Sequence, residues 1–246
     1  RELVDNALDA GASEIAVKLQ GGGIRAIVIE DDGCGIPAEE LPLALRRHAT
    51  SKIRSLDELE SVVTMGFRGE ALAAIASVSE MALASRTGDA PHAQRLDARS
   101  GELSPAARAV GTSVEVRELF FSTPARRKFL KSEATELAHC VDAVRRHALA
   151  RPDVGFAVWH EGRLVQQWRR AALTPATENP LADAAARDQR IKDVMGDDFI
   201  TQSRPVSLDL SVLRITGRTG TPEAARSRAD QQHVYVNGRY VRDKLI

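Results

Sequence analysis

The order of apolar and polar residues predicts alternating helices and strands, beginning with a helix over residues 1–10. Its apolar side chains recur at the three- and four-residue spacing of one helix face: Leu3, Val4, Ala7 and Leu8. Gly11 follows where a glycine commonly ends a helix in the left-handed conformation. We therefore expect an amphipathic helix that is closed by Gly11.

Runs of apolar and β-branched residues predict several strands. Residues 14–20 and 24–31 flank three consecutive glycines, which indicates a hairpin. Other strands are expected near residues 81–87, 93–98, 111–118, 154–160 and 163–169. Further helices are expected at residues 38–48, 70–78 and 125–150. Up to Arg170, this pattern of helices and strands is of the α/β type.

A second, smaller domain is expected after a stretch rich in alanine, threonine and proline that follows Arg170. We place the first domain at 1–173, the linker at 174–185 and the start of the second domain at 186–246. In the second domain we expect a helix at 190–195 and strands near 206–217 and 232–242. Asn237-Gly238 is a hairpin signal.

Composition limits the classes of function. The chain has 246 residues, of which 43% are hydrophobic, so it can bury a sizeable core. Its 34 basic and 34 acidic residues cancel, so only a local basic patch could bind DNA. Two cysteines give no disulfide framework or zinc spacing, and no apolar run is long enough to span a membrane. We expect an intracellular globular protein.

Glu2 and Asn6 are one helical turn apart and therefore share a face of the first helix. A carboxylate can take a proton from water, and an amide oxygen can ligate a hard cation without adding charge. Together they suit metal-assisted attack of water on a phosphate. Such residues more often form a solvated helix face, so this interpretation depends on the motifs that follow.

The second strand of the expected hairpin leads into Asp31-Asp32-Gly33-Cys34-Gly35. A carboxylate at the end of a buried strand needs a fixed hydrogen-bond donor. Neighbouring glycines allow a flat ligand to approach the backbone closely, and the amino group of an adenine would supply the donor. The alternative is an ordinary Asp-Gly turn, which is far commoner.

A glycine-bracketed loop, residues 66–72, leads into a helix. The free N–H groups at a helix start can bind an anion, and Lys52 and Arg68 can add positive charge. The chain contains no Walker sequence, so any phosphate site is of another type. Further on, Thr112 places a hydroxyl near the start of a strand.

Five motifs then carry a family resemblance: E-L-V-D-N-A-L-D-A-G, D-D-G-C-G-I, R-H-A-T-S-K, G-F-R-G-E-A-L and G-T-S-V-E-V. Their order resembles that of the nucleotide-binding motifs of the GHKL ATPases, which include DNA gyrase B, Hsp90 chaperones and histidine kinases. The third and fourth motifs, the segment 120–130 and Y-V-N-G-R at 235–239 resemble the MutL branch, the bacterial DNA mismatch repair family. The resemblance runs from Glu2 to Ile246.

The resemblance implies an α+β fold, the GHKL (Bergerat) ATPase sandwich, in which helices cover a mixed, largely antiparallel sheet. Part of an α/β domain like domain 2 of ribosomal protein S5 would follow. The implied cofactors are ATP and Mg²⁺. Glu2 would be the general base that deprotonates the attacking water, and Asn6 would be the Mg²⁺ ligand.

The resemblance assigns further nucleotide contacts. Those at the adenine would be Asp31, Gly33, Gly35 and Thr112. Two edges of a lid near the phosphates would be formed by Thr50, Ser51 and Lys52, and by Gly66, Phe67, Arg68, Gly69, Glu70, Ala71 and Leu72. Asp32 stands where relatives often carry asparagine. Arg239 lies at a loop where the family places a DNA-contacting arginine, and a purely structural role is the alternative for it.

The implied function is a slow, Mg²⁺-dependent ATPase that switches DNA mismatch repair, with ATP-driven dimer closure linking mismatch recognition to strand incision and removal. The alternative is a nucleotide-gated adaptor with little turnover. A histidine kinase is disfavoured because such kinases lack a base at the Glu2 position. The implied partners are a MutS-type mismatch recognition protein, a strand-incision nuclease, a helicase, and DNA bound with weak sequence specificity. The implied location is the bacterial cytoplasm, at the nucleoid.

Members of the family have a segment before the first helix and a lysine from the second domain that reaches the γ-phosphate. Both lie outside the 246 residues of this sequence. We therefore expect these residues alone to bind ATP weakly, to hydrolyse it hardly at all, and to be mostly monomeric. The homodimer would depend on ATP closure and on a C-terminal region.

Overall fold

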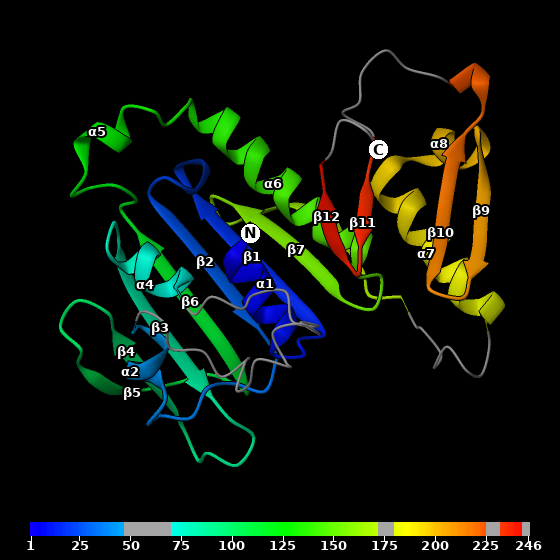
Figure 1. Ribbon diagram of the computed structural model, residues 1–246. Coiled ribbons are helices and arrows are strands. Elements are labelled where there is room, and N and C mark those ends of the chain that lie inside the picture. Colours follow the sequence, from blue (N-terminus) through cyan, green and yellow to red (C-terminus); the bar gives the residue numbers. More distant parts are fainter. Residues whose placement is uncertain (47–69, 172–179, 225–231, 243–246) are drawn as a thin grey trace. The chain divides into compact units, whose positions relative to one another are not determined.

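The computed structural model describes residues 1–46, 70–171, 180–224 and 232–242. The chain divides into two compact units, each with its own sheets (Figure 1). The first unit comprises Arg1–His147 and Val154–Arg170, and the second comprises Ala148–Asp153 and Ala171–Ile246. The domain limits expected from the sequence, with a linker at 174–185, stay a prediction.

An eight-stranded sheet forms the body of the first unit. Its strands are β1 (Glu14–Gln20), β2 (Ala26–Asp31), β3 (Glu80–Arg86), β4 (Ala93–Asp97), β5 (Leu103–Ala106), β6 (Gly111–Arg117), β7 (Gly155–His160) and β8 (Arg163–Trp168). They lie in the order β5-β4-β3-β6-β2-β1-β7-β8. Neighbouring strands are antiparallel except for β1 and β7, which are parallel. The mixed, largely antiparallel sheet expected from the sequence is therefore confirmed.

The alternation of residues along β1 places every second side chain in the core. Ile15, Val17 and Leu19 are buried, and the residues between them are more exposed. Val17 lies opposite Ile29 of β2 in the antiparallel register. The expected hairpin is present, and its turn is a short 3₁₀ segment, η1 (Gly21–Gly23). All three of these glycines have positive φ angles, which side chains disfavour.

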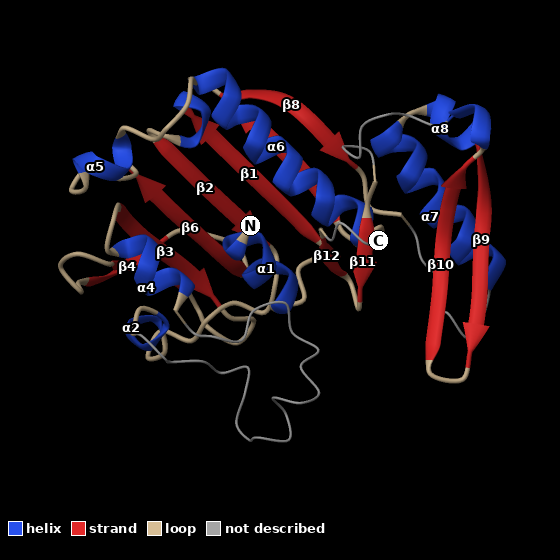
Figure 2. Ribbon diagram, turned by 45° about the horizontal axis from the view of Figure 1, so that its top comes forward, coloured by secondary structure: helices blue, strands red, loops and turns tan. Residues whose placement is uncertain are grey.

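Helices α1 (Glu2–Asp9), α4 (Ala71–Ala76) and α6 (Glu133–Ala150) lie on the same face of this sheet (Figure 2). The expected apolar stripe of α1 is buried. Gly11 has φ +74° and donates its N–H to the Leu8 carbonyl, while the Ala12 N–H reaches the Ala7 carbonyl. This pair of bonds is a Schellman ending, so the predicted glycine cap is confirmed.

Two of the expected helices were wrong in extent. In place of a helix over 38–48, the structure has α2 (Leu41–Ala44), and residues from 47 onward lie outside the described part. In place of one helix over 125–150, it has α5 (Pro124–Arg127) and then α6.

A capping arrangement explains why α6 begins anew. Ser132 Oγ accepts the Thr135 N–H at 3.4 Å, and the Glu136 carboxylate accepts the Lys131 N–H at 2.8 Å. Ser132 thus reaches an N–H of the first turn of α6, and Glu136 reaches back to the chain just before that turn, as in a capping arrangement. The serine and the glutamate therefore begin a separate helix.

Two tight turns join neighbouring antiparallel strands, and the one predicted at Asn237-Gly238 is confirmed. Between β7 and β8, Glu161 and Gly162 have φ angles of +48° and +74°. Between β11 (Val234–Val236) and β12 (Arg239–Val241), Asn237 and Gly238 have φ angles of +49° and +77°. Two successive residues with positive φ are the signature of a tight type I′ turn.

The second unit contains α7 (Pro180–Met195), α8 (Asp197–Thr201), η2 (Pro222–Ala224) and an antiparallel hairpin of β9 (Ser203–Leu210) and β10 (Leu213–Gly220). The strands expected near 206–217 are present as β9 and β10, and the chain turns back between them. The helix expected at 190–195 begins ten residues earlier, at Pro180.

Within this unit, the side chain of Arg190 is fully buried. Its guanidinium donates to the carbonyls of Ala148, Arg151 and Pro152 at 2.7, 3.0 and 3.2 Å. A cation suits carbonyls that have no partner within the helix at its C-terminal end. Arg190 of α7 therefore binds the last turn of α6.

Candidate active site

Asp31 lies at the end of β2 and is buried, with 8% of its surface exposed. Its Oδ1 accepts the backbone N–H of Gly33 at 2.9 Å and that of Thr112 at 3.2 Å. In the described part of the chain, no hydrogen bond reaches its other carboxylate oxygen, Oδ2. The carboxylate is thus held in place by one oxygen, and a second acceptor remains for a ligand.

Burial raises the pKa of Asp31 above its ordinary value of 3.8. The backbone N–H groups of Gly33 and Thr112 and the positive charge of Arg108 lower this pKa, but burial outweighs them. The net direction means that the charged carboxylate lacks some of the hydrogen bonding it would have in water. A donor placed at Oδ2 would restore part of it.

The backbone beside Asp31 leaves no room for side chains. Gly35 has φ +77°, and a Cβ there would lie 2.2 Å from the Arg86 carbonyl oxygen. A Cβ on Gly33 would lie 2.8 Å from the Cβ of Ala10 and 3.0 Å from Asp31 Oδ1. Both positions therefore require glycine, because Arg86 packs directly against Gly35, and Ala10 and Asp31 pack directly against Gly33.

Ser85, which the sequence did not single out, belongs to the same group of residues around Asp31, which we call the Asp31 corner: Asp31, Gly33, Gly35, Ser85 and Thr112. Its Oγ accepts the Ile36 N–H at 2.7 Å and lies 3.0 Å from the Gly111 carbonyl and 2.9 Å from Thr112 Oγ1. A hydroxyl has a single hydrogen, so when Ser85 donates to Gly111, Thr112 donates to Ser85. The Thr112 hydroxyl is thereby oriented, and β3 is joined to β6 beside Asp31.

Arg108 is a second residue that the sequence did not indicate. Its Nη2 donates to the Asp31 carbonyl oxygen at 2.7 Å, and its Nη1 lies 3.5 Å from the Ala84 carbonyl. It stands in an alanine-rich loop segment between β5 and β6 whose sequence carries no motif. Arg108 therefore ties the end of β2 to β3.

Asp32, next in the chain, has a structural role. Its carboxylate accepts the Ser13 N–H at 2.7 Å, the Ser13 hydroxyl at 2.6 Å and the Glu14 N–H at 2.8 Å. Burial raises the pKa of Asp32, but these hydrogen bonds outweigh it and the net pKa is lowered. Asp32 thus binds the start of β1, whereas Asp31 keeps an oxygen for a ligand.

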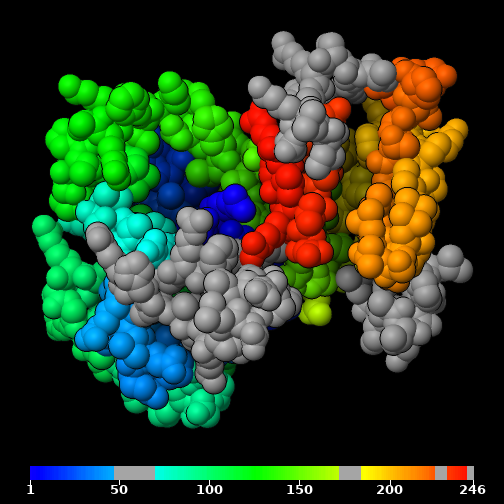
Figure 3. Space-filling view, in the orientation of Figure 1, coloured from blue at the N-terminus to red at the C-terminus, as the bar shows by residue number. Residues whose placement is uncertain are grey.

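The first helix carries Glu2 and Asn6 as expected, on consecutive turns of α1. Glu2 is exposed and Asn6 is half-buried. The helix contacts β2 and α4, and part of its surface is visible in the space-filling view (Figure 3). The same helix that precedes the Asp31 corner therefore offers a carboxylate at the surface.

The predicted lid residues are placed only in part. Thr50, Ser51, Lys52, Gly66, Phe67, Arg68 and Gly69 lie outside the described residues. Glu70 occupies the N-cap position of α4, and Ala71 and Leu72 form its first turn. Arg239 lies at the start of β12, directly after the Asn237-Gly238 turn, and is half-buried.

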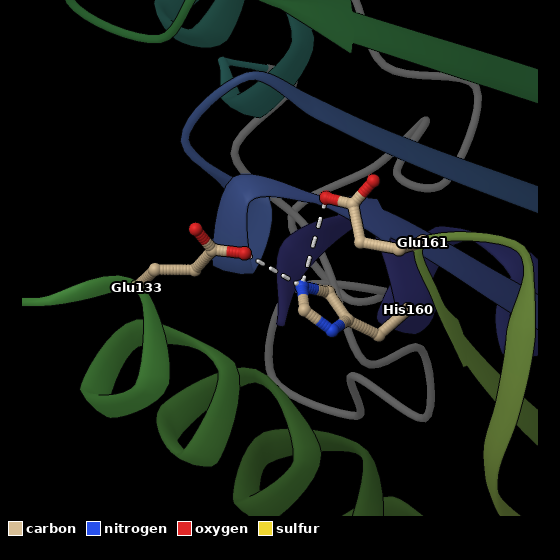
Figure 4. A group of neighbouring side chains, drawn as sticks. All are labelled: Glu133, His160 and Glu161. Carbon is tan, nitrogen blue, oxygen red and sulfur yellow. Dashed lines mark hydrogen bonds and ion pairs between the residues drawn. The ribbon is translucent and has the colours of Figure 1, made fainter.

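Among the described residues, the side chains that could together hold a metal ion are Glu133, His160 and Glu161 (Figure 4). His160 Nε2 lies 3.1 Å from Glu133 Oε1 and 3.9 Å from Glu161 Oε1. Glu161 also accepts the Gly21 N–H at 2.8 Å and pairs with Arg25 at 2.5 Å. These contacts therefore connect the η1 turn to the β7–β8 turn, and the polar groups of the cluster have partners within the protein. The cluster is separate from the Asn6 site predicted for Mg²⁺.

Comparisons with known proteins agree with this geometry. Residues 1–108 match the family described as histidine kinase-, DNA gyrase B-, and HSP90-like ATPase. Residues 191–246 match the family described as DNA mismatch repair protein, C-terminal domain.

The DNA mismatch repair protein MutL of Ralstonia nicotianae is 52% identical over the whole chain, and that of Azotobacter vinelandii is 48% identical. The chain spans 36% and 37% of the length of these two relatives. In the described residues, no helix is long and apolar enough to cross a membrane.

Solved structures are similar over nearly the whole chain. The Aquifex aeolicus MutL ATPase domain complexed with ADP has a TM-score of 0.69 and 28% identity, and covers 99% of this chain and 81% of its own. The N-terminal domain of a DNA repair protein has a TM-score of 0.75 and 25% identity, covering 97% and 73%. With the sheet order, the Asp31 corner and the α1 face, these likenesses show that the chain belongs to the MutL family, as its GHKL-type ATPase region followed by part of its S5-like domain.

Proposed function

We propose that this chain binds ATP and, with Mg²⁺, hydrolyses it slowly to ADP and phosphate as a switch in DNA mismatch repair. The observation that carries the proposal is the Asp31 carboxylate, which is buried, fixed through Oδ1 and open to a donor at Oδ2. An adenine amino group is a donor that matches this oxygen. The similar MutL ATPase domain of Aquifex aeolicus is complexed with ADP, which supports the same class of ligand.

The adenine contacts follow from this corner. Asp31 would accept a hydrogen bond from the amino group. Thr112, whose hydroxyl is oriented by Ser85, would present its hydroxyl oxygen beside the base. Gly33 and Gly35, which let the loop pack closely against Ala10 and Arg86, would lie beside the base. The lid residues named above would close near the phosphates from both edges.

Glu2 would act as the general base. Its exposed carboxylate takes a proton from water while the water oxygen forms a bond to the γ-phosphorus; the bond from that phosphorus to the bridging oxygen breaks, and ADP leaves. Asn6 offers a neutral amide oxygen one turn away, which would help to hold a Mg²⁺ ion. The ion, when bound, would neutralise developing charge on the phosphates.

In the whole protein, ATP would close a homodimer and ADP would release it. This cycle would link a MutS-type mismatch recognition protein to a strand-incision nuclease and a helicase on DNA, in the cytoplasm at the nucleoid. Arg239 would contribute to DNA contact. The second candidate is a nucleotide-gated adaptor with little turnover, but the Glu2 carboxylate favours hydrolysis, because a protein that only binds ATP needs no base there.

Calorimetric titration with ATP tests the adenine site in two neighbouring variants. Asp31→Asn should weaken binding by about 1–3 kcal/mol, since an amide can present a donor to the adenine amino group and leave a buried mismatch. Asp32→Asn is the matched control and should bind ATP as the natural protein does, because in the described structure the Asp32 carboxylate accepts hydrogen bonds from Ser13 and Glu14. Equal affinity of the Asp31→Asn variant and the natural protein would contradict the proposed site.

A further inference from the structure

Asp5 is a buried carboxylate on the helix that carries Glu2 and Asn6. It is 4% exposed, and the other buried side chains of α1 are apolar. Asp5 stands directly before Asn6 and three residues after Glu2. Its side chain therefore leaves the helix within one turn of both proposed active-site groups.

Asp5 has two partners: the largely exposed Arg1, whose Nε lies 3.6 Å from Asp5 Oδ2 one turn earlier, and a buried residue 142 positions later in the chain, on α6. His147 Nε2 is 2.8 Å from Asp5 Oδ1, and the two side chains are 11% and 6% exposed. His147 Nδ1 lies 2.7 Å from the Ala143 carbonyl on its own helix. The imidazole is thus held at both of its polar atoms, and it presents a fixed partner to α1.

This contact differs in kind from the apolar packing of α1. Apolar side chains bury area without direction, so they tolerate small rotations and shifts of a short helix. A buried carboxylate is costly without a partner, and a hydrogen bond weakens steeply as its angle departs from linear. The Asp5–His147 bond therefore selects one rotational setting of α1.

We propose that Asp5 and His147 form a positioning pair for ATP hydrolysis: by fixing the rotation of α1, they aim Glu2 at the attacking water and Asn6 at the metal. The inference rests on the proposed function, because it gives the pair no contact with the nucleotide. The inference adds two positioning residues to that function, and it identifies α6 as the helix that holds α1 in position.

Single substitutions would leave a buried polar group without its partner, and such variants can fail to fold. The informative variant removes both groups: Asp5→Leu with His147→Leu. Replacing both partners of a buried polar pair with apolar side chains is often tolerated. The test uses the whole natural protein that carries these residues, with steady-state ATP hydrolysis, ATP titration and thermal unfolding measured on each variant.

The double variant should keep its unfolding temperature and its KM for ATP within about threefold, while kcat falls about 10- to 100-fold, as expected for a small misplacement of reacting groups. His147→Gln, which retains a donor near the Nε2 position, should recover part of the loss. The matched control is Glu133→Gln with His160→Gln, which alters another carboxylate–histidine pair that involves α6; its kcat should not change.

A double variant that folds and keeps the natural kcat would overturn the inference. So would a parallel loss of kcat and unfolding temperature in all variants, since that would assign the pair to stability alone. The natural protein and Glu2→Ala are assayed beside them. If the natural protein does not turn over ATP, the proposed function fails; if Glu2→Ala loses turnover while the double variant does not, only this inference fails.

Discussion

The backbone N–H of Thr112 donates to the Asp31 carboxylate across 81 positions of sequence, at 3.2 Å. The bond joins the end of β2 to the start of β6, two strands that are neighbours in the sheet. It fixes Oδ1 and leaves Oδ2 for a ligand. The adenine specificity proposed for the chain depends on these two roles: Oδ1 accepts the backbone N–H groups, and Oδ2 accepts a donor from the ligand.

The raised pKa of Asp31 gives a pH-dependent prediction. The folded protein holds this proton more tightly than the unfolded chain does, so the contribution of Asp31 to stability is complete below its ordinary pKa of 3.8. It is lost as the pH rises through the folded pKa. Asp31→Asn, which carries no charge, should therefore unfold at higher denaturant concentration than the natural protein at neutral pH, with the difference shrinking as the pH falls.

Asp32→Asn is the control, and its effect on stability should depend on pH in the opposite direction. Because the pKa of Asp32 is lowered, its contribution is present above the ordinary pKa and is lost as the pH falls through the folded value. Urea unfolding curves at a series of pH values measure both differences. A stability gain of Asp31→Asn that does not vary with pH would contradict the assignment of a buried carboxylate with a raised pKa.

Gly35→Ala should disrupt the same corner through the backbone. Gly35 has φ +77°, and the added Cβ would lie 2.2 Å from the Arg86 carbonyl oxygen. We expect a loss of about 1–3 kcal/mol in the free energy of unfolding, because strain of this kind must be relieved by moving β3 or the loop. The variant should also bind ATP more weakly.

Gly88→Ala is the matched control for that substitution. Nothing lies within 4 Å of a Cβ at Gly88, and its φ angle is not in the region that disfavours side chains. Its unfolding curve and ATP titration should match those of the natural protein. Equal behaviour of the two variants would show that the close approach at Gly35 has no consequence for the site.

Asn6→Ala tests the proposed metal ligand. Removing one amide oxygen should weaken ATP binding in the presence of Mg²⁺ and affect binding much less when EDTA removes the metal, because the lost contact is to the ion. Titrations of both proteins under the two conditions give the comparison. A loss of the same size with and without Mg²⁺ would show that Asn6 contacts the nucleotide or supports α1 instead.

Local patterns predicted much of the fold because local physics decides those elements. The apolar stripe and Gly11 defined α1, and Asn237-Gly238 defined its hairpin. The break between α5 and α6 was missed because helix-forming residues continue across it, while the Ser132 and Glu136 caps act through single hydrogen bonds. β5 was missed because it is a short edge strand that contains Pro105.

Some residues of the candidate site could be predicted from local sequence, and others could not. Glu2, Asn6 and Asp31 stand in ordered motifs, so the family resemblance could propose roles for them. Ser85, Arg108 and the Asp5–His147 pair depend on contacts between distant segments. No local pattern encodes such contacts, since a serine in a strand or a histidine on a helix is usually an ordinary surface or core residue.

The most direct test of the proposed ATPase is Glu2→Ala, measured as kcat and as affinity for ATP in the same preparation of the whole natural protein. A general base acts in the transition state and adds little to binding of the substrate. We predict that kcat falls about 10²- to 10⁴-fold, that ATP affinity stays within about threefold, and that the exposed control Glu40→Ala changes neither. A loss of ATP affinity as large as the loss of kcat, or full turnover by Glu2→Ala, would contradict the account.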